Sequence, residues 1–198
     1  MAPQAFALFD TAIGVCGVVW NEIGLTGTAL PDRGAEALRD RLSRRWPQAV
    51  DSQPWGAGAE AVTAIQALMA DGRTDLTGLA LDETGLTDFL KRVYAAARAV
   101  PPGQTRTYGQ IAAAAGAPGE ARAVGQAMGK NPWPIVVPCH RVMGADGKLT
   151  GFSAPGGVDT KLRLLSIEQA RLSDAPGLFD DLGGLPLSVR RPGLSPPR

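Results

Sequence analysis

The sequence predicts a mixed α/β segment followed by a helical segment that carries a helix-turn-helix and a two-stranded wing. Short strand-like runs alternate with amphipathic helices in the first half, and a helix, Gly-containing turn and helix follow in the second. The chain of 198 residues is long enough for two small domains. We expect an α/β domain over 1–85, a helix-turn-helix domain over 86–172, and a flexible Pro- and Gly-rich tail over 173–198.

The first half shows both strand and helix periodicity. Leu38 and Leu42 lie four residues apart, as on one face of a helix, and Gly72 follows a second periodic run as a stop signal. The predicted elements are, in order, strands at 6–9 and 17–20, helices at 34–45 and 59–70, and a short strand around 79–81.

The second half contains clear helix caps and turn signals. Thr87 and Thr107 precede apolar-periodic runs as N-caps, and a tight turn at 116–119 separates two short helices. Asp146-Gly147 is a strong hairpin-turn signal. The predicted elements are helices at 87–100, 108–115, 120–130 and 160–171, a buried strand at 135–137, and a hairpin wing formed by 142–143 and 149–150.

The composition is that of a soluble globular protein. Hydrophobic residues make up 44% and charged residues 20% of the chain, and no apolar run is long enough for a membrane span. The first nine residues lack the pattern of a secretory signal, so we expect a cytoplasmic protein. The two cysteines, Cys16 and Cys139, lie 123 residues apart, and a structural disulfide is not expected in a reducing compartment.

Charge is distributed unevenly along the chain. Residues 1–87 contain six Lys and Arg against eleven Asp and Glu, whereas residues 88–172 contain eleven against five. A basic second half indicates a polyanion-binding domain attached to a non-binding one. Two domains that attract each other would show the same asymmetry, so charge alone leaves both interpretations open.

Pro138-Cys139-His140-Arg141 is the segment most suggestive of chemistry. A free thiol has a pKa of about 8.5, so a cysteine nucleophile needs a base or a positive environment. His140, the only histidine, is adjacent to Cys139 in sequence, and Arg141 adds positive charge nearby. On residue types alone a buried structural cysteine or a cysteine protease or amidase remains possible. A zinc site is a poor interpretation, because no second pair of ligands accompanies this one.

Several ordered blocks around this cysteine resemble the O6-alkylguanine-DNA alkyltransferase family. The run from Asn131 to Val142, Asn-Pro-Trp-Pro-Ile-Val-Val-Pro-Cys-His-Arg-Val, resembles the family signature, and residues 89–169 resemble its C-terminal domain. The resemblance implies a ribonuclease-H-like α/β N-terminal domain and a winged helix-turn-helix C-terminal domain. It also implies a single-turnover enzyme that repairs DNA by irreversible, stoichiometric transfer of an alkyl group from O6-alkylguanine to its own Cys139.

The resemblance also implies roles for individual residues. Cys139 would accept the alkyl group, His140 would take the thiol proton through a water, and Glu168 would orient the imidazole. Glu168 matches the family's glutamate by its seven-residue spacing from Lys161. Tyr108 would donate to N3 of the leaving guanine. On residue types alone, a glutamate late in a helix is usually solvated and a tyrosine at a helix start usually packs in the core.

The same resemblance assigns the DNA-binding surface and the base pocket. The helix at 120–130 is rich in small residues that let its backbone approach the minor groove, and Arg122 would fill the stack vacated by a flipped base. An Ala-rich helix buried against its neighbours is the alternative. The implied DNA-binding residues are Thr107, Ala121, Arg122, Ala123 and Gly125. The implied pocket and supporting residues are Asn131, Val142, Phe152 and Ser153.

Two departures and two rival classes complete the interpretation. The first half has one cysteine and no histidine, so the metal site found in some family members is not expected, and no cofactor is implied. Phe152 stands where tyrosine is frequent. We expect a monomer whose partner is double-stranded DNA containing O6-alkylguanine, with no membrane and no obligate protein partner.

Two rival classes remain. Alkyltransferase-like damage-recognition proteins bind flipped alkylguanine without transfer and replace the cysteine, whereas a cysteine hydrolase needs an oxyanion site that we do not find.

Overall fold

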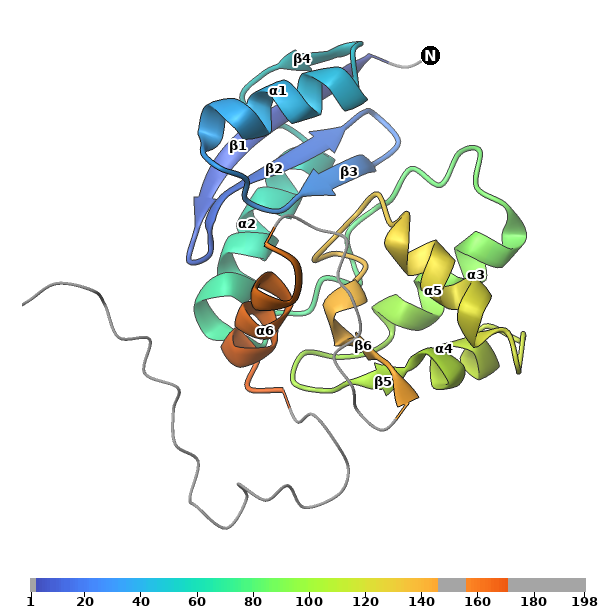
Figure 1. Cartoon of the computed structure of the whole chain (residues 1–198). Helices are drawn as coiled ribbons and strands as arrows, with labels where there is room; N and C mark the ends of the chain where they lie inside the picture. The colour runs from blue at the N-terminus through green and yellow to red at the C-terminus, as the bar shows by residue number, and fades with distance from the viewer. Residues whose placement is uncertain (1–2, 146–155, 171–198) are drawn as a thin grey trace, which may run out of the picture.

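The computed structural model describes residues 3–145 and 156–170 of the chain. An N-terminal sheet with its helices lies beside a group of helices from the second half (Figure 1). Three of the sequence expectations lie outside the described residues: the tail, the Asp146-Gly147 turn with its second wing strand, and the pocket loop with Phe152 and Ser153.

The N-terminal half is built on a mixed four-stranded sheet in the order β3-β2-β1-β4. Strands β1 (Gln4–Thr11) and β2 (Gly14–Trp20) are antiparallel, which confirms the two predicted strands, although both are longer. β3 (Leu25–Ala29) pairs antiparallel with β2, and β4 (Ala49–Asp51) pairs parallel with β1. Neither β3 nor β4 was predicted, and the strand expected at 79–81 is reduced to one bridge between Leu25 and Leu81.

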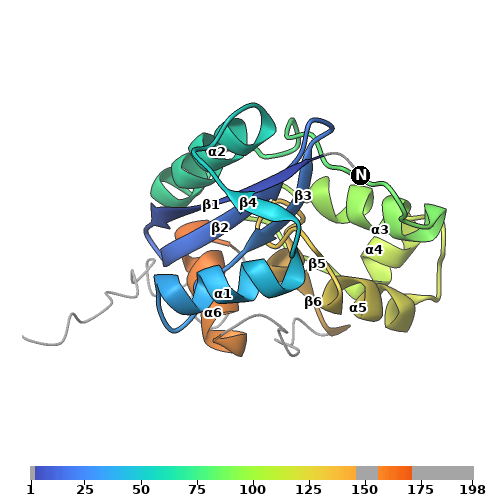
Figure 2. The same ribbon diagram turned by 90° about the horizontal axis from the view of Figure 1, so that it is seen from above.

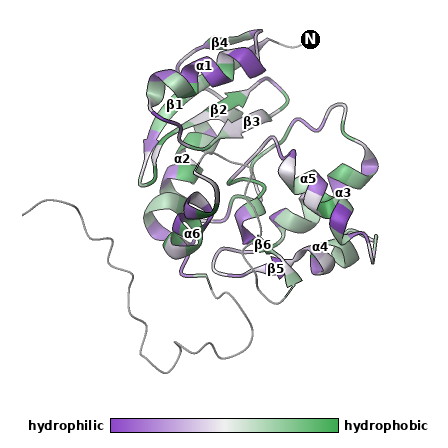
Figure 3. Cartoon of the chain, in the orientation of Figure 1, coloured by the Kyte–Doolittle hydropathy of each residue, from purple (hydrophilic) through white to green (hydrophobic). Residues whose placement is uncertain are grey.

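Helices α1 (Ala35–Arg45) and α2 (Ala57–Asp71) cover opposite faces of this sheet (Figure 2). The strand alternation explains the two layers, because Phe6 and Val19 cluster with Leu38 and Leu42 of α1. The opposite face of the sheet packs on α2, and Gly72 caps that helix in the left-handed region. Most residues of α1 are hydrophilic (Figure 3), and those two leucines are the only buried residues of the helix. Both helices confirm the prediction.

The second half contains the predicted helix-turn-helix. Helix α3 (Asp88–Arg98) is capped by Thr87, as predicted. Helix α4 (Tyr108–Ala114) begins with a reciprocal capping box between Thr107 and Gln110, and a short turn leads to α5 (Ala121–Gly129). None of the helices in the described ranges is both long and apolar enough to cross a membrane.

The strand predicted at 135–137 is wrong. These residues form a buried turn in which the Val137 amide donates to the Trp133 carbonyl at 2.8 Å and Ile135 has a φ of 79°. The prolines at 134 and 138 lack an N–H, so the segment has few donors for a sheet ladder. The following β6 (Val142–Met143) pairs in parallel with β5 (Arg106–Thr107), and the predicted hairpin pairing with 149–150 stays a prediction.

The last described helix joins the two halves. α6 (Gly157–Ile167) begins and ends earlier than the predicted 160–171, and Glu168 is its C-cap residue. Figure 1 shows α6 beside α2, and Arg163 donates to the carbonyls of Ala12 and Ile13 in the turn between β1 and β2. The position of Glu168 is therefore fixed from both halves of the chain.

Strand β3 supports the buried turn that precedes Cys139. The Thr28 amide donates to the Pro132 carbonyl at 2.9 Å, and the Thr28 hydroxyl donates to the Pro134 carbonyl at 2.5 Å. The Trp133 indole N–H donates to the Leu25 carbonyl at 2.7 Å. Because a buried indole N–H or hydroxyl usually has a hydrogen-bond partner, these bonds satisfy both groups and dock the turn on the sheet.

Candidate active site

Cys139 opens a short 3-10 helix, η1 (Cys139–Arg141), directly after the buried turn. The residue is partly exposed, whereas Cys16 is completely buried, and both are free cysteines. Burial raises the pKa of the Cys139 thiol, and the Asn131 amide and the Lys161 ammonium act in the opposite direction. Cys139 is thus the accessible thiol, in surroundings where two polar neighbours favour its anionic form.

His140 is a neutral imidazole, and one of its two ring nitrogens is hydrogen-bonded to Glu168. Its ring is completely buried, and Nε2 lies 2.9 Å from Oε1 of Glu168. Burial lowers the pKa of His140 below its ordinary value, although the Glu168 carboxylate opposes that shift. A carboxylate only accepts, so Nε2 carries the hydrogen, and Nδ1 has no partner among the described residues. This tautomer leaves a lone pair at Nδ1 that can take up a proton.

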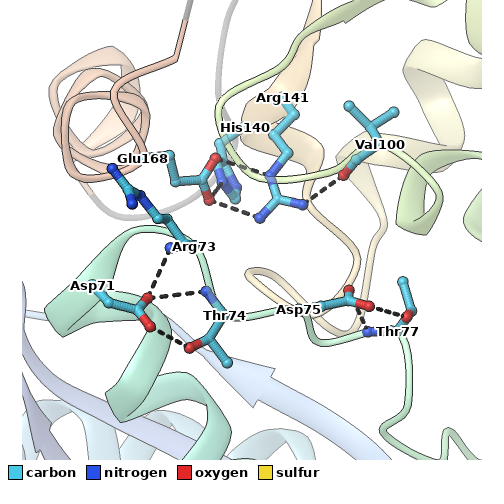
Figure 4. Close-up of polar contacts among 9 residues, drawn as sticks. All are labelled: Asp71, Arg73, Thr74, Asp75, Thr77, Val100, His140, Arg141 and Glu168. Carbon is cyan, nitrogen blue, oxygen red and sulfur yellow. Dashed lines mark hydrogen bonds and ion pairs between the residues drawn. The ribbon is translucent and has the colours of Figure 1, made fainter.

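Glu168 forms the centre of a buried hydrogen-bond cluster (Figure 4). Arg141 donates from Nε to Oε2 at 2.9 Å and from Nη2 to Oε1 at 2.8 Å. Burial alone would raise the pKa of Glu168, but the hydrogen bonds and charges of His140 and Arg141 lower it to about 2. The carboxylate is therefore ionised at neutral pH.

Two expectations about this cluster need correction. On residue types alone Glu168 was expected on a solvated face, but it is buried and bonded to His140, as the family resemblance implied. Arg141 was expected to add positive charge near the thiol. Its guanidinium instead faces Glu168 and also donates from Nη1 to the Val100 carbonyl at 2.6 Å, so its charge is matched by the carboxylate.

The loop after α2 lies beside this cluster (Figure 4). Gly72 has a φ of 67°, and a Cβ added there would lie 2.1 Å from the Ile167 carbonyl oxygen. Only glycine satisfies both the conformation and the close approach. Asp71 and Asp75 order the rest of the loop through bonds to Thr74 and Thr77. The N-terminal half therefore supports the backbone under Glu168.

Asn131 links the end of α5 to the reactive cysteine. Its side-chain amide donates to the Val137 carbonyl at 2.8 Å, and its Oδ1 accepts from the Trp133 amide at 2.9 Å. The asparagine thus closes the turn that leads into Cys139. Val142, which was expected to support the pocket, is buried in β6, and its carbonyl accepts from Lys161.

Helix α5 presents small residues next to an exposed arginine. Arg122 is exposed, Ala121 and Ala123 are half-buried, and the buried residues of the helix are Val124, Ala127 and Met128. The helix therefore packs against its neighbours on one face, as the alternative held, while Arg122 and the small residues around it remain partly exposed. Tyr108 is half-buried at the start of α4, and a Cβ at Gly125 would lie 3.9 Å from its ring. The side chain of Thr107 is engaged in the capping box.

Sequence reasoning missed Lys161 as a residue of the site. Its side chain is buried, and its ammonium donates to the Val142 carbonyl at 2.6 Å. A signal was available, because Lys161, Leu164 and Glu168 share one face of a helix at i, i+3 and i+7. Within residues 3–145 and 156–170, no cluster of His, Cys, Asp and Glu could hold a metal ion.

The fold and the site together define a protein with a candidate cysteine nucleophile placed next to a helix-turn-helix. Residues 88–170 match the family model for the DNA-binding domain of 6-O-methylguanine DNA methyltransferase. The chain is 40% identical over 171 residues to a methylated-DNA–protein-cysteine methyltransferase of Mycolicibacterium paratuberculosis, covering 86% of this chain and 96% of the relative. A Mycobacterium leprae protein of the same name is 47% identical over 125 residues, 63% of this chain and 73% of that protein.

Solved structures agree with the sequence relatives. The O6-methylguanine methyltransferase of Mycobacterium tuberculosis superposes with a TM-score of 0.67 at 38% identity, covering 84% of this chain and 93% of that one. The M. tuberculosis protein OGT in complex with DNA also gives a TM-score of 0.67, at 36% identity, covering 83% and 92%. The chain belongs to the methylated-DNA–protein-cysteine methyltransferase family.

Proposed function

We propose that this protein repairs DNA by transferring the alkyl group of O6-alkylguanine irreversibly to its own Cys139. The observation that carries the proposal is an accessible cysteine that directly precedes a neutral His140, with Glu168 bonded to the far side of the imidazole. The M. tuberculosis relative of known structure that binds DNA has the same fold. No observation favours the rival class that recognises damage without transfer, since the acceptor cysteine is present.

The reaction is a direct displacement at carbon. The thiol proton passes, through a water, to Nδ1 of His140, and the Cys139 sulfur attacks the carbon attached to O6. The S–C bond forms as the C–O6 bond breaks, and the electron pair stays on guanine. Guanine then takes up one proton, for which the Tyr108 hydroxyl at N3 is the proposed donor, and Tyr108 recovers the proton held on His140. The thiol hydrogen is thereby exchanged for the alkyl group.

Glu168 and Arg141 make the proton transfer possible from a buried position. The Glu168 carboxylate stabilises the imidazolium that forms on His140 and holds the ring in the tautomer with a free Nδ1. Arg141 fixes the carboxylate through two hydrogen bonds. No group in the described site would return the thioether to a thiol, so each chain acts once.

The DNA is engaged from the minor groove by α5. Ala121, Ala123 and Gly125 let the helix backbone approach the groove wall, and exposed Arg122 fills the stack that the target base leaves. Thr107, the N-cap residue of the first helix of the helix-turn-helix, is a further DNA-contacting residue in this proposal. Asn131 and Val142 support the pocket, and the other proposed pocket residues, Phe152 and Ser153, lie outside the described residues.

The proposal also covers the domains of the protein, its cellular location and its partner. Residues 1–85 form a ribonuclease-H-like domain and residues 86–172 a winged helix-turn-helix domain. The protein acts as a cytoplasmic monomer on double-stranded DNA, without metal or cofactor. Continuous packing between the sheet and the second half supports one cooperative unit around the site.

Intact-protein mass spectrometry tests the function directly. With excess O6-methylguanine duplex, we expect each chain to gain one methyl group, located on Cys139 by peptide mapping. O6-benzylguanine should likewise add one benzyl group to the same residue. Several turnovers per chain, or label on another residue, would contradict the mechanism, and binding without any gain in mass would favour the damage-recognition class.

An Arg122→Ala protein should repair duplex DNA more slowly. Loss of the inserted side chain leaves the vacated stack unfilled, so we expect about tenfold slower transfer from duplex, equivalent to about 1.4 kcal/mol. Single-turnover rates with the duplex and with free O6-benzylguanine measure the effect, and the free base should react at the wild-type rate. Arg33→Ala, an exposed arginine in the other half, is the matched control. An unchanged duplex rate would exclude the role given to Arg122.

A further inference from the structure

Lys161 is a buried cation whose charge is not matched by any of the described acids. The residue is 1% exposed, and its ammonium has three donors, one of which binds the Val142 carbonyl, the acceptor found for it among residues 3–145 and 156–170. A buried ammonium is costly unless it is paired. The salt bridges formed by the described residues do not include Lys161.

The neighbouring charged groups are already committed. Glu168, the C-cap residue of α6, lies on the same helical face as Lys161. Its Oε1 accepts from His140, and both of its oxygens accept from Arg141. Asp75, on the loop after α2, is an exposed carboxylate that bonds to Thr77 and also interacts with Arg141 and Arg98. Tyr94 of α3 interacts with Cys139 as a neutral phenol with a raised pKa.

Within the part of the chain that the structure describes, Cys139 is the remaining group near Lys161 that can carry negative charge. Burial lowers the pKa of Lys161, and the cysteine charge opposes that shift, just as Lys161 favours the thiolate of Cys139. The chain geometry explains the pairing. The carbonyl that holds the ammonium belongs to Val142, three residues after Cys139, so one short segment positions both partners.

We infer that Lys161 is the counter-charge of the Cys139 thiolate, a positioning residue that makes the nucleophile attainable as an anion. His140 removes the proton, and Lys161 stabilises the negative charge that the proton leaves on sulfur. When the S–C bond forms, the sulfur becomes neutral and this stabilisation ends. The inference rests on the proposed function only in assigning Cys139 as the nucleophile.

The test uses iodoacetamide, which reacts with the thiolate and needs neither DNA nor a base pocket. The Cys139 sulfur forms a bond to carbon and iodide leaves, and the rate across pH reports the pKa of Cys139. In Lys161→Gln, which keeps a donor for the Val142 carbonyl, we expect the midpoint to rise by about one unit and the rate at pH 7 to fall about tenfold. Lys161→Arg should restore most of the rate.

Matched measurements separate this inference from a general loss of structure. Lys91→Met removes a lysine from the partly exposed surface of α3 and should leave the pH profile of Cys139 unchanged. If Lys161→Gln does not fold, Lys161→Met, which fills the same buried volume, gives the same comparison. A wild-type midpoint in a folded charge-removing variant would overturn the inference. A raised midpoint supports it even if no methyl transfer from DNA is observed, which would contradict the proposed function alone.

Discussion

A Cys139→Ala protein should accept no methyl group from an O6-methylguanine duplex while it still binds that duplex. The substitution removes the only partly exposed sulfur of the described site and leaves α5 and Arg122 in place. We therefore expect complete loss of transfer, measured by intact mass after hours of incubation, with duplex affinity within about threefold, or about 0.7 kcal/mol, of the wild-type value.

Cys16→Ala is the matched control. Its thiol is completely buried in β2, and burial raises its pKa to about 11, although a hydrogen bond with Thr11 acts in the other direction. Such a thiol is unreactive, so transfer should proceed at the wild-type rate. Methyl transfer to Cys139→Ala at any residue would disprove the assignment of the acceptor.

Replacing Glu168 by glutamine should damage both stability and transfer. Glutamine has nearly the same size but no charge, so Arg141 is left as a buried cation without its counter-charge. Breaking a buried pair in this way costs about 3–5 kcal/mol. His140 also loses the carboxylate that stabilises its charged form, and we expect transfer to slow by about a hundredfold. Urea unfolding and single-turnover kinetics measure the two effects.

The pH dependence of stability gives an independent measurement of the same cluster. The pKa of Glu168 falls from an ordinary 4.5 to about 2 in the folded protein, so on acidification the unfolded chain takes up the proton first. Its contribution to the free energy of unfolding is complete above about pH 4.5 and is lost as the pH falls towards 2. His140 acts in the same direction from about pH 6.5 downward, because its folded pKa is lowered from 6.5.

The free energy of unfolding should thus decrease from pH 7 to pH 3, and less steeply in Glu168→Gln. Glu60→Gln, on the exposed side of α2, serves as the control and should follow the wild-type curve. Parallel curves for wild type and Glu168→Gln would show that the carboxylate contributes no pH-dependent stability.

Local patterns were enough to predict the helices. Thr87 and Thr107 are true N-caps, and the apolar faces of α1, α2 and α3 follow the helical period, so propensity and burial agree there. Cys139 and His140 were also predicted to be the catalytic pair from their adjacency and from the surrounding motif, and these roles stay a prediction. These features are readable because they depend on residues close together in the chain.

The missed strands depend on contacts from distant parts of the chain. β3 reads Leu-Thr-Gly-Thr-Ala, and the central Gly27 is unfavourable for a strand by itself. A Cβ at that position would lie 2.2 Å from the Trp46 ring, so the glycine is required by packing against the residue that follows α1. Conversely, the β-branched run at 135–137 is typical of a strand, but the flanking prolines and the left-handed backbone conformation of Ile135 prevent one, and the segment forms a loop.

The buried charges were the least predictable part of the site. Lysine and arginine are usually solvated, and only the helical face that Lys161 shares with Leu164 indicates that Lys161 is buried. Their partners, the Val100 carbonyl for Arg141 and the Val142 carbonyl for Lys161, lie 41 and 19 residues away. Sequence adjacency suggested that Arg141 would act on the thiol, whereas the fold pairs it with a carboxylate.

The docking of β3 on the prolines at 132 and 134 has a consequence for how substitutions are read. Thr28 donates to both of those carbonyls, and Trp133 between them donates to the Leu25 carbonyl. A substitution in β3, an edge strand more than 100 residues before Cys139 in the chain, can therefore change the position of the Cys139 backbone. Loss of repair in a variant of the first thirty residues therefore need not reflect misfolding or weakened DNA contact. Faster hydrogen exchange at the Trp133 indole, with unchanged exchange elsewhere, would show that the turn before Cys139 has separated from β3 while the rest of the fold persists.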